Sequence, residues 1–389
     1  MMLEVSEISK KIQSSPTRKL FNMAKTLDDV VDFTLGDPDI QTPENIKNAA
    51  CEAIRTGKTR YSHNAGLIEL RETISNYYEK KEGYIYSPKD EIIVTVGAME
   101  GLYLSLLSLI NPGDEVIIPA PYYVNYVQMV ILCHGIPVIV ESSNDDELSF
   151  NVCDIEKVVT SKTKAIIINT PSNPSGHIIS DDKIKVISDI AKRKDLIVIS
   201  DEVYKSLIYD KKKFKSIVAI DGMRERTILV NSLSKEFCMT GWRLGYVLGP
   251  KKVIETMTKL QENIVACAPL PSQYAAIEAL NHGNSCTNDI LETFAKRREV
   301  LINEFKKVPL VRCNIPEATF YVMVDISATN MTSEEFALTL LREEHVAVVP
   351  GIAYGKSCDK YVRIAFTLNE DKIIEGVGRF KRFINKLIK

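Results

Sequence analysis

The chain has 389 residues, a length that predicts two or three domains at roughly 150 residues per domain. Apolar residues make up 45% and charged residues 26%, the values of an ordinary globular protein with a sizeable core. The 49 basic and 51 acidic residues leave a net charge of −2, which gives no electrostatic support for a nucleic-acid or anionic-membrane partner.

Cysteine and histidine spacing argues against a metal site. The eight cysteines are scattered without a CxxC pair, and no two of the five histidines lie three to five residues apart. We therefore expect no zinc or iron–sulfur centre and assign no metal. The N-terminus lacks the apolar segment of a secretory signal, and the longest nearly apolar stretch, 102–110, is too short to span a bilayer. A cytoplasmic protein with reduced cysteines is the expectation.

Residues 1–45 are expected to form an N-terminal arm that packs on a small C-terminal domain, because prolines and glycines interrupt any long element there. Residues 46–285 alternate helix-length patterns with β-rich runs. The runs lack polar alternation, which is typical of strands covered on both faces. They are 92–96, 115–119, 137–140, 165–169, 196–200, 227–231 and 245–249. This rhythm predicts a three-layer α/β domain around a mostly parallel seven-stranded sheet.

The rhythm changes after about residue 285. A charged helix (289–307), a strand pair around 318–325 and a second helix (333–343) come before two β-rich segments. A last helix starts at Asp371. This succession predicts a smaller α+β domain over residues 286–389.

Two nucleotide-binding signatures are set aside. The chain contains no GxGxxG, so the dinucleotide fingerprint is missing despite the α/β rhythm. Residues 351–357 look like a phosphate loop, but the segment is one residue short and Pro350 stands in place of the first glycine.

The most informative segment covers residues 231–245. It places Lys235 just after a buried-type strand, with Ser232 and Ser234 before it and Arg243 after it. Hydroxyls, a guanidinium and loop amides together suit a phosphate. A desolvated lysine near a cation can act as an amine nucleophile. A single lysine is more often an exposed turn residue, but the whole constellation favours a site.

This segment reads Ser-Leu-Ser-Lys-x3-Met-Thr-Gly-Trp-Arg-x-Gly and closely resembles the cofactor-lysine motif of class I/II aminotransferases of the aspartate/aromatic type. These enzymes use pyridoxal 5′-phosphate (PLP) and have the type I fold. The resemblance runs in order over nearly the whole chain, from Leu35–Asp39 to Tyr361–Ala365. It implies the type I fold, bound PLP and a homodimer.

The resemblance also implies catalytic roles. Lys235 would form a Schiff base with PLP and then move a proton between substrate and cofactor. Asp201 would pair with the ring nitrogen, whereas taken alone it is better explained as a helix N-cap. Asn173 and Tyr204 would hydrogen-bond the ring's phenolic oxygen, and Asn173 lies in Pro171–Gly176, a good turn by itself.

The same resemblance assigns the remaining cofactor contacts. Tyr123 would stack on the ring, with Tyr122 as the competing candidate. The phosphate would lie at a helix N-terminus, where backbone amides and the helix dipole favour an anion. Its ligands would be Ala98, Met99, Ser232, Ser234 and Arg243. Tyr61 resembles a tyrosine that relatives extend across a dimer interface to the partner's phosphate.

Substrate contacts are expected from four residues. Arg363 would bind the α-carboxylate bidentately, helped by Gly36 and Asn173. Arg18 in the arm either favours a dicarboxylic side chain or is part of a solvated basic pair. The segment Pro316–Tyr321 departs from the Pro-x-Gly-Ala-Phe-Tyr common in relatives, which leaves substrate preference open.

We therefore expect an amino-acid aminotransferase with a ping-pong mechanism. It would take an aspartate or aromatic donor and pass nitrogen to a 2-oxo acid, with 2-oxoglutarate as the expected acceptor. The alternatives are a PLP-dependent C–S β-lyase and an N-acetyl-diaminopimelate aminotransferase. A PLP-fold regulator fused to a DNA-binding module is a different class, and the roughly 45 residues before the core leave no room for that module.

Overall fold

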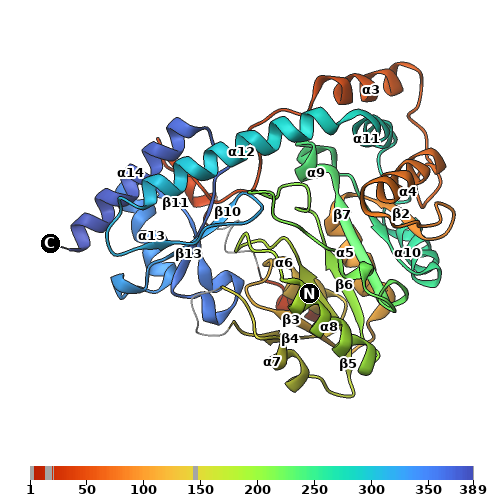
Figure 1. The fold of residues 1–389 in the computed structure, drawn as a ribbon, viewed down its shortest axis with the longest axis horizontal. Coiled ribbons are helices and arrows are strands. Elements are labelled where there is room, and N and C mark those ends of the chain that lie inside the picture. Colours follow the sequence, from red (N-terminus) through yellow and green to blue (C-terminus); the bar gives the residue numbers. More distant parts are fainter. Residues whose placement is uncertain (1–3, 14–19, 21, 143–147, 389) are drawn as a thin grey trace.

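The computed structural model describes residues 4–13, 20, 22–142 and 148–388 (Figure 1). Its strands form a seven-stranded sheet, a four-stranded sheet and a two-stranded pair. The large sheet has the order β2-β8-β7-β6-β5-β3-β4. Its strands are β2 (Ile92–Thr95), β3 (Glu115–Pro119), β4 (Ile136–Val140), β5 (Thr163–Asn169), β6 (Ile197–Asp201), β7 (Thr227–Ser232) and β8 (Gly245–Leu248).

Within the described residues, β8 lies antiparallel to both β2 and β7, and the other pairs of this sheet are parallel. All seven β-rich runs of the sequence are strands of this sheet. The predicted fold class, a mostly parallel seven-stranded sheet with a smaller α+β part, is confirmed.

The sheet is apolar on both faces because helices cover both (Figure 1). Neighbouring residues of one strand therefore enter different core clusters. Val198 of β6 packs with Ile187 of α8 (Asp181–Arg193). Ile199 instead packs with Leu102 of α5 (Gly97–Leu109) and Ile254 of α10 (Lys251–Ile264). This double burial explains why the runs show no polar alternation.

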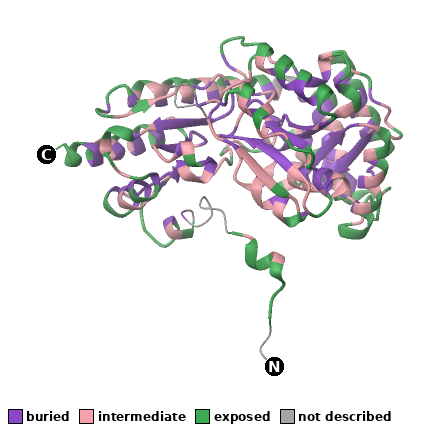
Figure 2. Cartoon of the chain, turned by 90° about the horizontal axis from the view of Figure 1, so that it is seen from below, coloured by how far each residue is buried: buried purple, intermediate pink, exposed green. Residues whose placement is uncertain are grey.

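The helices associated with the large sheet and the arm are α1 (Glu7–Lys11), α3 (Glu44–Arg55), α4 (Ile68–Glu82), α5 (Gly97–Leu109), α6 (Asn125–Leu132), α7 (Val152–Lys157), α8 (Asp181–Arg193), α9 (Leu233–Glu236), α10 (Lys251–Ile264) and α11 (Leu270–His282). Four of these helices, α1, α7, α8 and α9, begin at a residue whose side chain caps the first turn. The Ser180 side chain, for example, accepts the backbone N–H of Lys183 at the start of α8. The strands are largely buried, whereas exposed residues lie on the outer surface of the helices (Figure 2). The inward face of α8, for example, buries Ile184, Ile187 and Ala191.

The smaller sheet has the order β12-β13-β10-β9, and its strand pairs are antiparallel. Its strands are β9 (Arg312–Cys313), β10 (Tyr321–Asp325), β12 (Val349–Pro350) and β13 (Tyr361–Ala365). The helices packed on it are α12 (Asn284–Phe305), α13 (Ser333–Glu344) and α14 (Glu370–Leu387). Phe294, Leu340 and Phe380 from these three helices meet Val322 and Ile364 of the sheet in one core cluster.

The N-terminal segment contacts both parts of the molecule. The backbone N–H of Gln13 donates to the side chain of Gln128 in α6, 3.0 Å away. Further along, β1 (Val31–Asp32) pairs in parallel with β11 (Val346–Ala347) beside the small sheet. The domain boundaries 1–45, 46–285 and 286–389 stay a prediction.

The direction of the strands indicates where a ligand site should lie. β2, β3, β5, β6 and β7 all run the same way, so their carboxyl ends meet at one edge of the sheet. In open α/β sheets ligands bind outside this edge. Among the described residues, no helix combines the length and apolarity needed to cross a membrane.

Candidate active site

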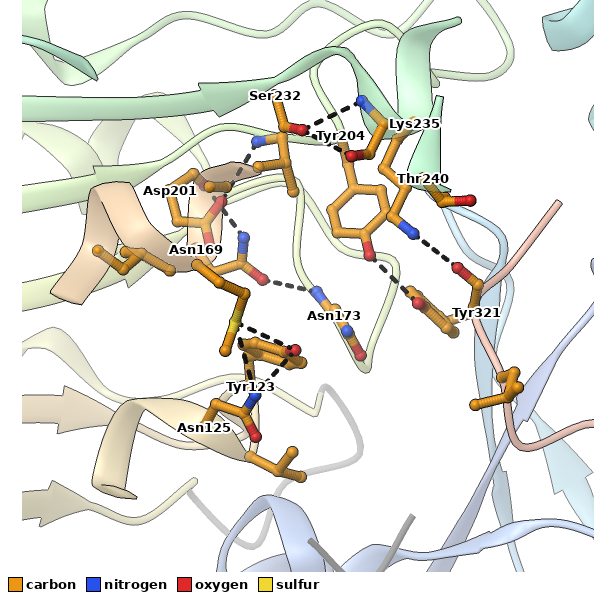
Figure 3. A pocket seen from close by; sticks show the side chains of 18 of the residues that line it. Tyr123, Asn125, Asn169, Asn173, Asp201, Tyr204, Ser232, Lys235, Thr240 and Tyr321 are labelled. Atoms are coloured by element: carbon orange, nitrogen blue, oxygen red, sulfur yellow. Dashed lines mark hydrogen bonds between the residues drawn. The ribbon is translucent and has the colours of Figure 1, made fainter. Parts of the chain in front are cut away.

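A cavity of about 360 Å³ lies at the carboxyl edge of the large sheet, between that sheet and residues of the arm and small sheet. Twelve of the fourteen residues predicted for the site line it. They are Gly36, Ala98, Met99, Tyr123, Asn173, Asp201, Tyr204, Ser232, Ser234, Lys235, Arg243 and Arg363. Side chains from several elements converge on this space (Figure 3).

Lys235 enters the cavity from α9, directly after β7. Its Nζ donates to the carbonyl oxygen of Gly36 at 2.6 Å. Burial, helped by the cations of Arg243 and Arg363 and opposed by Asp37, lowers the pKa of Lys235 to about 8. A substantial fraction of this amine is therefore neutral near physiological pH and available as a nucleophile or base.

Asp201 ends β6 and is 4% exposed. Its Oδ2 accepts the hydroxyl of Tyr126 at 2.6 Å, and its Oδ1 accepts the backbone N–H of Val203 at 3.3 Å. Burial raises the pKa of Asp201 to about 6, although both hydrogen bonds oppose the rise. Such a buried carboxylate is suited to pairing with a cationic ligand atom.

The start of α5 and the β7–β8 connection form the predicted phosphate cup. A Cβ at Gly97 would lie 2.6 Å from Nη2 of Arg243, so the absence of a side chain lets the guanidinium reach the first turn of α5. The hydroxyl oxygens of Ser232 and Ser234 lie 2.8 Å apart. Backbone amides, hydroxyls and a guanidinium at a helix N-terminus are the groups that bind phosphate.

Arg363 reaches the cavity from β13 of the small sheet and is 4% exposed. Its Nη1 donates to Oδ1 of Asn173 at 3.2 Å, and its Nη2 donates to the carbonyl oxygen of Thr34. Its Nε is buried and has no hydrogen-bond partner among the described residues. The guanidinium therefore has unused donor capacity toward a carboxylate.

The aromatic residues separate into two groups. Tyr123 and Tyr204 line the cavity, whereas the competing candidate Tyr122 lines a smaller cavity behind it. The Tyr204 and Tyr321 hydroxyl oxygens are 3.1 Å apart (Figure 3). The stacking role of Tyr123 stays a prediction.

One predicted site residue, Tyr61, is not brought to the cavity. Tyr61 is 88% exposed and does not line the cavity, and its role at a partner subunit's phosphate stays a prediction. Arg18 lies outside the described residues. No group of three or more potential metal ligands was found in the described part of the chain.

Several residues in or beside the cavity were missed in the sequence. Asn169 ends β5, and its amide donates to the carbonyl oxygen of Asp201 at 3.0 Å while accepting the N–H of Asn173. Its position at a strand end was a usable signal. The contacts of Tyr126 and Tyr321 depend on partners 75 and 117 positions away, so local patterns carried no signal for them.

The family profile described as "Aminotransferase class I and II" matches residues 28–380. The chain belongs to the class I and II aminotransferases. An aspartate aminotransferase of Pyrococcus abyssi is 41% identical over 377 residues, covering 96% of this chain and 97% of the relative. The crystal structure of an aromatic aminotransferase from Pyrococcus horikoshii superposes with a TM-score of 0.89 at 39% identity, covering 94% and 99%.

A third relative bears on the alternatives. A Bacillus subtilis protein named "Probable N-acetyl-LL-diaminopimelate aminotransferase" is 35% identical over 379 residues, covering 97% of this chain and 95% of the relative. The aminotransferase family is thus shown, while its named relatives differ in substrate.

Class I and II aminotransferases use PLP, and the cavity of this aminotransferase fits that group. It offers a buried carboxylate, a lysine of lowered pKa and a side-chain-free turn beside Arg243. These groups complement a ring nitrogen, an aldehyde and a phosphate respectively. The enzyme class predicted from the sequence, an aminotransferase, is confirmed.

Proposed function

We propose that this aminotransferase binds PLP at Lys235 and transfers the amino group of an L-amino acid to a 2-oxo acid by a ping-pong mechanism. The observation that carries the proposal is the convergence of Lys235, Asp201 and Arg363 on one buried cavity. They supply an amine, an anion and a carboxylate-binding fork within a single space. A solvent-exposed lysine without such neighbours would not support it.

Bound PLP supplies a ring that stabilises the negative charge developing at the substrate Cα. Asp201 would hold the ring nitrogen through its buried carboxylate. Ser232, Ser234 and Arg243 would bind the phosphate, together with the amides of Ala98 and Met99. Tyr204 and Asn173 would donate hydrogen bonds to the phenolic oxygen, and Tyr123 would pack against the ring.

Two residues would act on the substrate. Arg363 would fix the α-carboxylate, and this fixes the direction of the Cα–H bond relative to Lys235. Nζ of Lys235, with its pKa of about 8, would accept the proton from the substrate Cα and pass it to the cofactor. Gly36 would complete the carboxylate site with its backbone.

We further propose an aspartate or aromatic donor and 2-oxoglutarate as acceptor. Relatives named for aspartate and for aromatic amino acids support the donor classes. The dicarboxylic preference would draw on Arg18 of the arm. A homodimer with shared sites and a cytoplasmic location belong to the same proposal, and the exposed Tyr61 is consistent with the first.

The decisive experiment is a panel of amino acids against 2-oxoglutarate, pyruvate and oxaloacetate, with Lys235→Ala as the inactive control. We expect turnover only when both an amino donor and an oxo acid are present. Catalytic release of pyruvate and ammonia from an amino acid alone would instead identify a C–S lyase. Turnover of N-acetyl-diaminopimelate and of no standard amino acid would support the third candidate.

A further inference from the structure

Tyr321 lies between Tyr204, the proposed cofactor-binding residue, and Arg363, the proposed carboxylate-binding residue. It is the first residue of β10, is 3% exposed and lines the cavity. Residues Tyr321 and Ala365 are partners across the β10–β13 pair, so Tyr321 and Arg363 lie on the same face of the small sheet. No role in the site was assigned to Tyr321 above.

The ring of Tyr321 supports the carboxylate-binding cation. The guanidinium carbon of Arg363 lies 4.4 Å from the centroid of this ring. An aromatic face at this distance attracts a guanidinium and restricts its rotation. The ring is itself confined, because a Cβ placed on Gly36 would lie 1.7 Å from the Tyr321 hydroxyl oxygen.

The hydroxyl of Tyr321 contacts the proposed cofactor-binding tyrosine. Its oxygen lies 3.1 Å from that of Tyr204, and both atoms are buried (Figure 3). The two rings meet edge to face at 5.7 Å. One side chain thus touches the residue proposed to bind the cofactor and the residue proposed to bind the substrate carboxylate.

The two hydroxyls differ in acidity. Burial raises the pKa of Tyr204 well above its ordinary value, and neighbouring acidic groups raise it further. Burial also raises the pKa of Tyr321, but the Arg363 cation opposes that rise. The distance of 3.1 Å allows either hydroxyl to donate. Because a hydroxyl has one proton and the proposed function commits that of Tyr204 to the phenolic oxygen, Tyr321 donates and Tyr204 accepts.

We propose that Tyr321 is a positioning residue with two separable actions: its hydroxyl donates to Tyr204, and its ring holds Arg363. With its oxygen occupied by Tyr321, the Tyr204 hydroxyl directs its own proton into the cavity. The proposal rests on the proposed function, since it concerns the groups that hold PLP and the substrate carboxylate.

Two substitutions separate the actions. Tyr321→Phe keeps the ring over Arg363 and removes the hydroxyl, whereas Tyr321→Leu removes both. Tyr209→Phe is the matched control, because Tyr209 is buried in the same core cluster, donates to the carbonyl oxygen of Thr319 and does not line the cavity. Thermal unfolding of each holoenzyme would show that all variants are folded.

The first readout is the pH midpoint of the visible absorption band of the holoenzyme without substrate. A donor to the phenolic oxygen lowers this midpoint, and Tyr204 is the proposed donor. Without the hydrogen bond from Tyr321, Tyr204 is a weaker donor. Tyr321→Phe should therefore raise the midpoint by about 0.5 to 1 pH unit, the size of one neutral hydrogen bond. Tyr204→Phe should raise it as well. The double variant should shift by less than the sum, because both changes remove one hydrogen-bonded chain.

The second readout is the Michaelis constant for the amino acid. Tyr321→Phe should leave it within about twofold, whereas Tyr321→Leu should raise it about fivefold to tenfold through loss of the Arg363 contact. Tyr209→Phe should change neither readout. A merely structural role for Tyr321 would not produce this division between the two variants.

An unmoved midpoint in Tyr321→Phe beside a shifted midpoint in Tyr204→Phe would overturn the proposal. Fully additive shifts in the double variant, or an equal rise of the Michaelis constant in both Tyr321 variants, would also overturn it. If wild-type protein mixed with PLP shows no visible band, the proposed function itself fails and this inference falls with it.

Discussion

The guanidinium of Arg363 is largely buried at the wall of the cavity, and this decides what it can do. It is held by the Tyr321 ring, Asn173 and the Thr34 carbonyl oxygen, and its Nε is left without a partner among the described residues. A largely buried cation with unused donors favours a carboxylate strongly, because burial strengthens charge-assisted hydrogen bonds.

Arg363→Ala should therefore raise the Michaelis constant about tenfold to a hundredfold for every amino acid tested, since charged hydrogen bonds are lost whatever the side chain. Steady-state kinetics with aspartate, tyrosine and alanine would measure this. Arg193→Gln, which removes only an exposed ion pair, is the control. A loss confined to dicarboxylic donors would reassign Arg363 to the side-chain pocket.

The lowered pKa of Lys235 makes a prediction for the cofactor-free protein. The folded pKa is about 8 against 10.5 for an ordinary lysine, so the unfolded chain binds the proton more tightly. Burial of Lys235 thus destabilises the fold below pH 8, and this cost disappears as the pH rises toward 10.5.

Lys235→Met should accordingly raise the free energy of unfolding by about 1 to 2 kcal/mol at pH 7, after allowing for the lost hydrogen bond to Gly36. The gain should shrink or reverse at pH 10. Denaturant titrations of cofactor-free wild type and variant at both pH values would test this. An identical difference at pH 7 and pH 10 would rule out the titration of Lys235 as its source.

Most of the cavity lining was predictable, because the family resemblance indicated Lys235 and its neighbours through one motif, and Asp201 and Arg363 through their matching segments. Tyr126, Tyr321 and Thr34 were not predictable. Their contacts with Asp201, Tyr204 and Arg363 arise only when distant parts of the chain come together.

At the scale of elements, residues 351–357 look like a phosphate loop in the sequence, but in the structure their backbone N–H groups bind a carboxylate of the protein itself. These residues form two short 3₁₀ turns, and the carboxylate of Glu141, just after β4, accepts the backbone N–H groups of Lys356 at 3.2 Å and Ser357 at 2.9 Å. The Ser357 hydroxyl also donates to Glu141 at 2.7 Å. The protein's own carboxylate thus occupies these donors and ties the large sheet to the small one.

Glu141→Ala should loosen this tie. With the charged acceptor lost, amide hydrogen exchange in the peptide containing Lys356 and Ser357 should quicken about tenfold, because roughly 1.4 kcal/mol of local stability is removed. Mass spectrometry would follow the exchange, with the exposed pair member Glu156→Ala as the control. Unchanged exchange in Glu141→Ala would show that the contact contributes nothing to holding the loop.

Element type was predictable because the strands are buried on both faces and therefore rich in Val and Ile. Ends were less so: the run expected at 165–169 begins at Thr163. The order of the strands within the large sheet could not be predicted from the sequence. Nothing in the local sequence of Gly245–Leu248 says that this strand inserts antiparallel between β2 and β7.

At the scale of the whole molecule, residues 34–42 join the two parts. Thr34 and Gly36 accept hydrogen bonds from Arg363 and Lys235, while Asp39 forms an ion pair at 2.7 Å with the buried Arg297 of α12. Thr34, Leu35 and Gly36 of this segment, which neither sheet contains, form part of the cavity wall. The sequence predicted an arm here but not most of its contacts, because glycines and prolines interrupt the regular patterns from which packing partners are predicted.

The proposed dimer makes a complementation prediction. Lys235→Ala and Tyr61→Ala homodimers should each be impaired, the first in chemistry and the second in holding the partner's phosphate. Mixed after mild dissociation, they should recover about a quarter of wild-type activity, since half of the dimers are hybrids with one intact site. Activity that stays at the level of the unmixed variants would place Tyr61 outside the partner's site.

The central claim concerns one amine. Borohydride reduction of the PLP-loaded protein, followed by proteolysis and mass spectrometry, should fix the cofactor on the peptide that contains Lys235, and Lys235→Ala should retain none. A stable label on another lysine, or an unlabelled Lys235 in protein that carries bound PLP, would contradict the account.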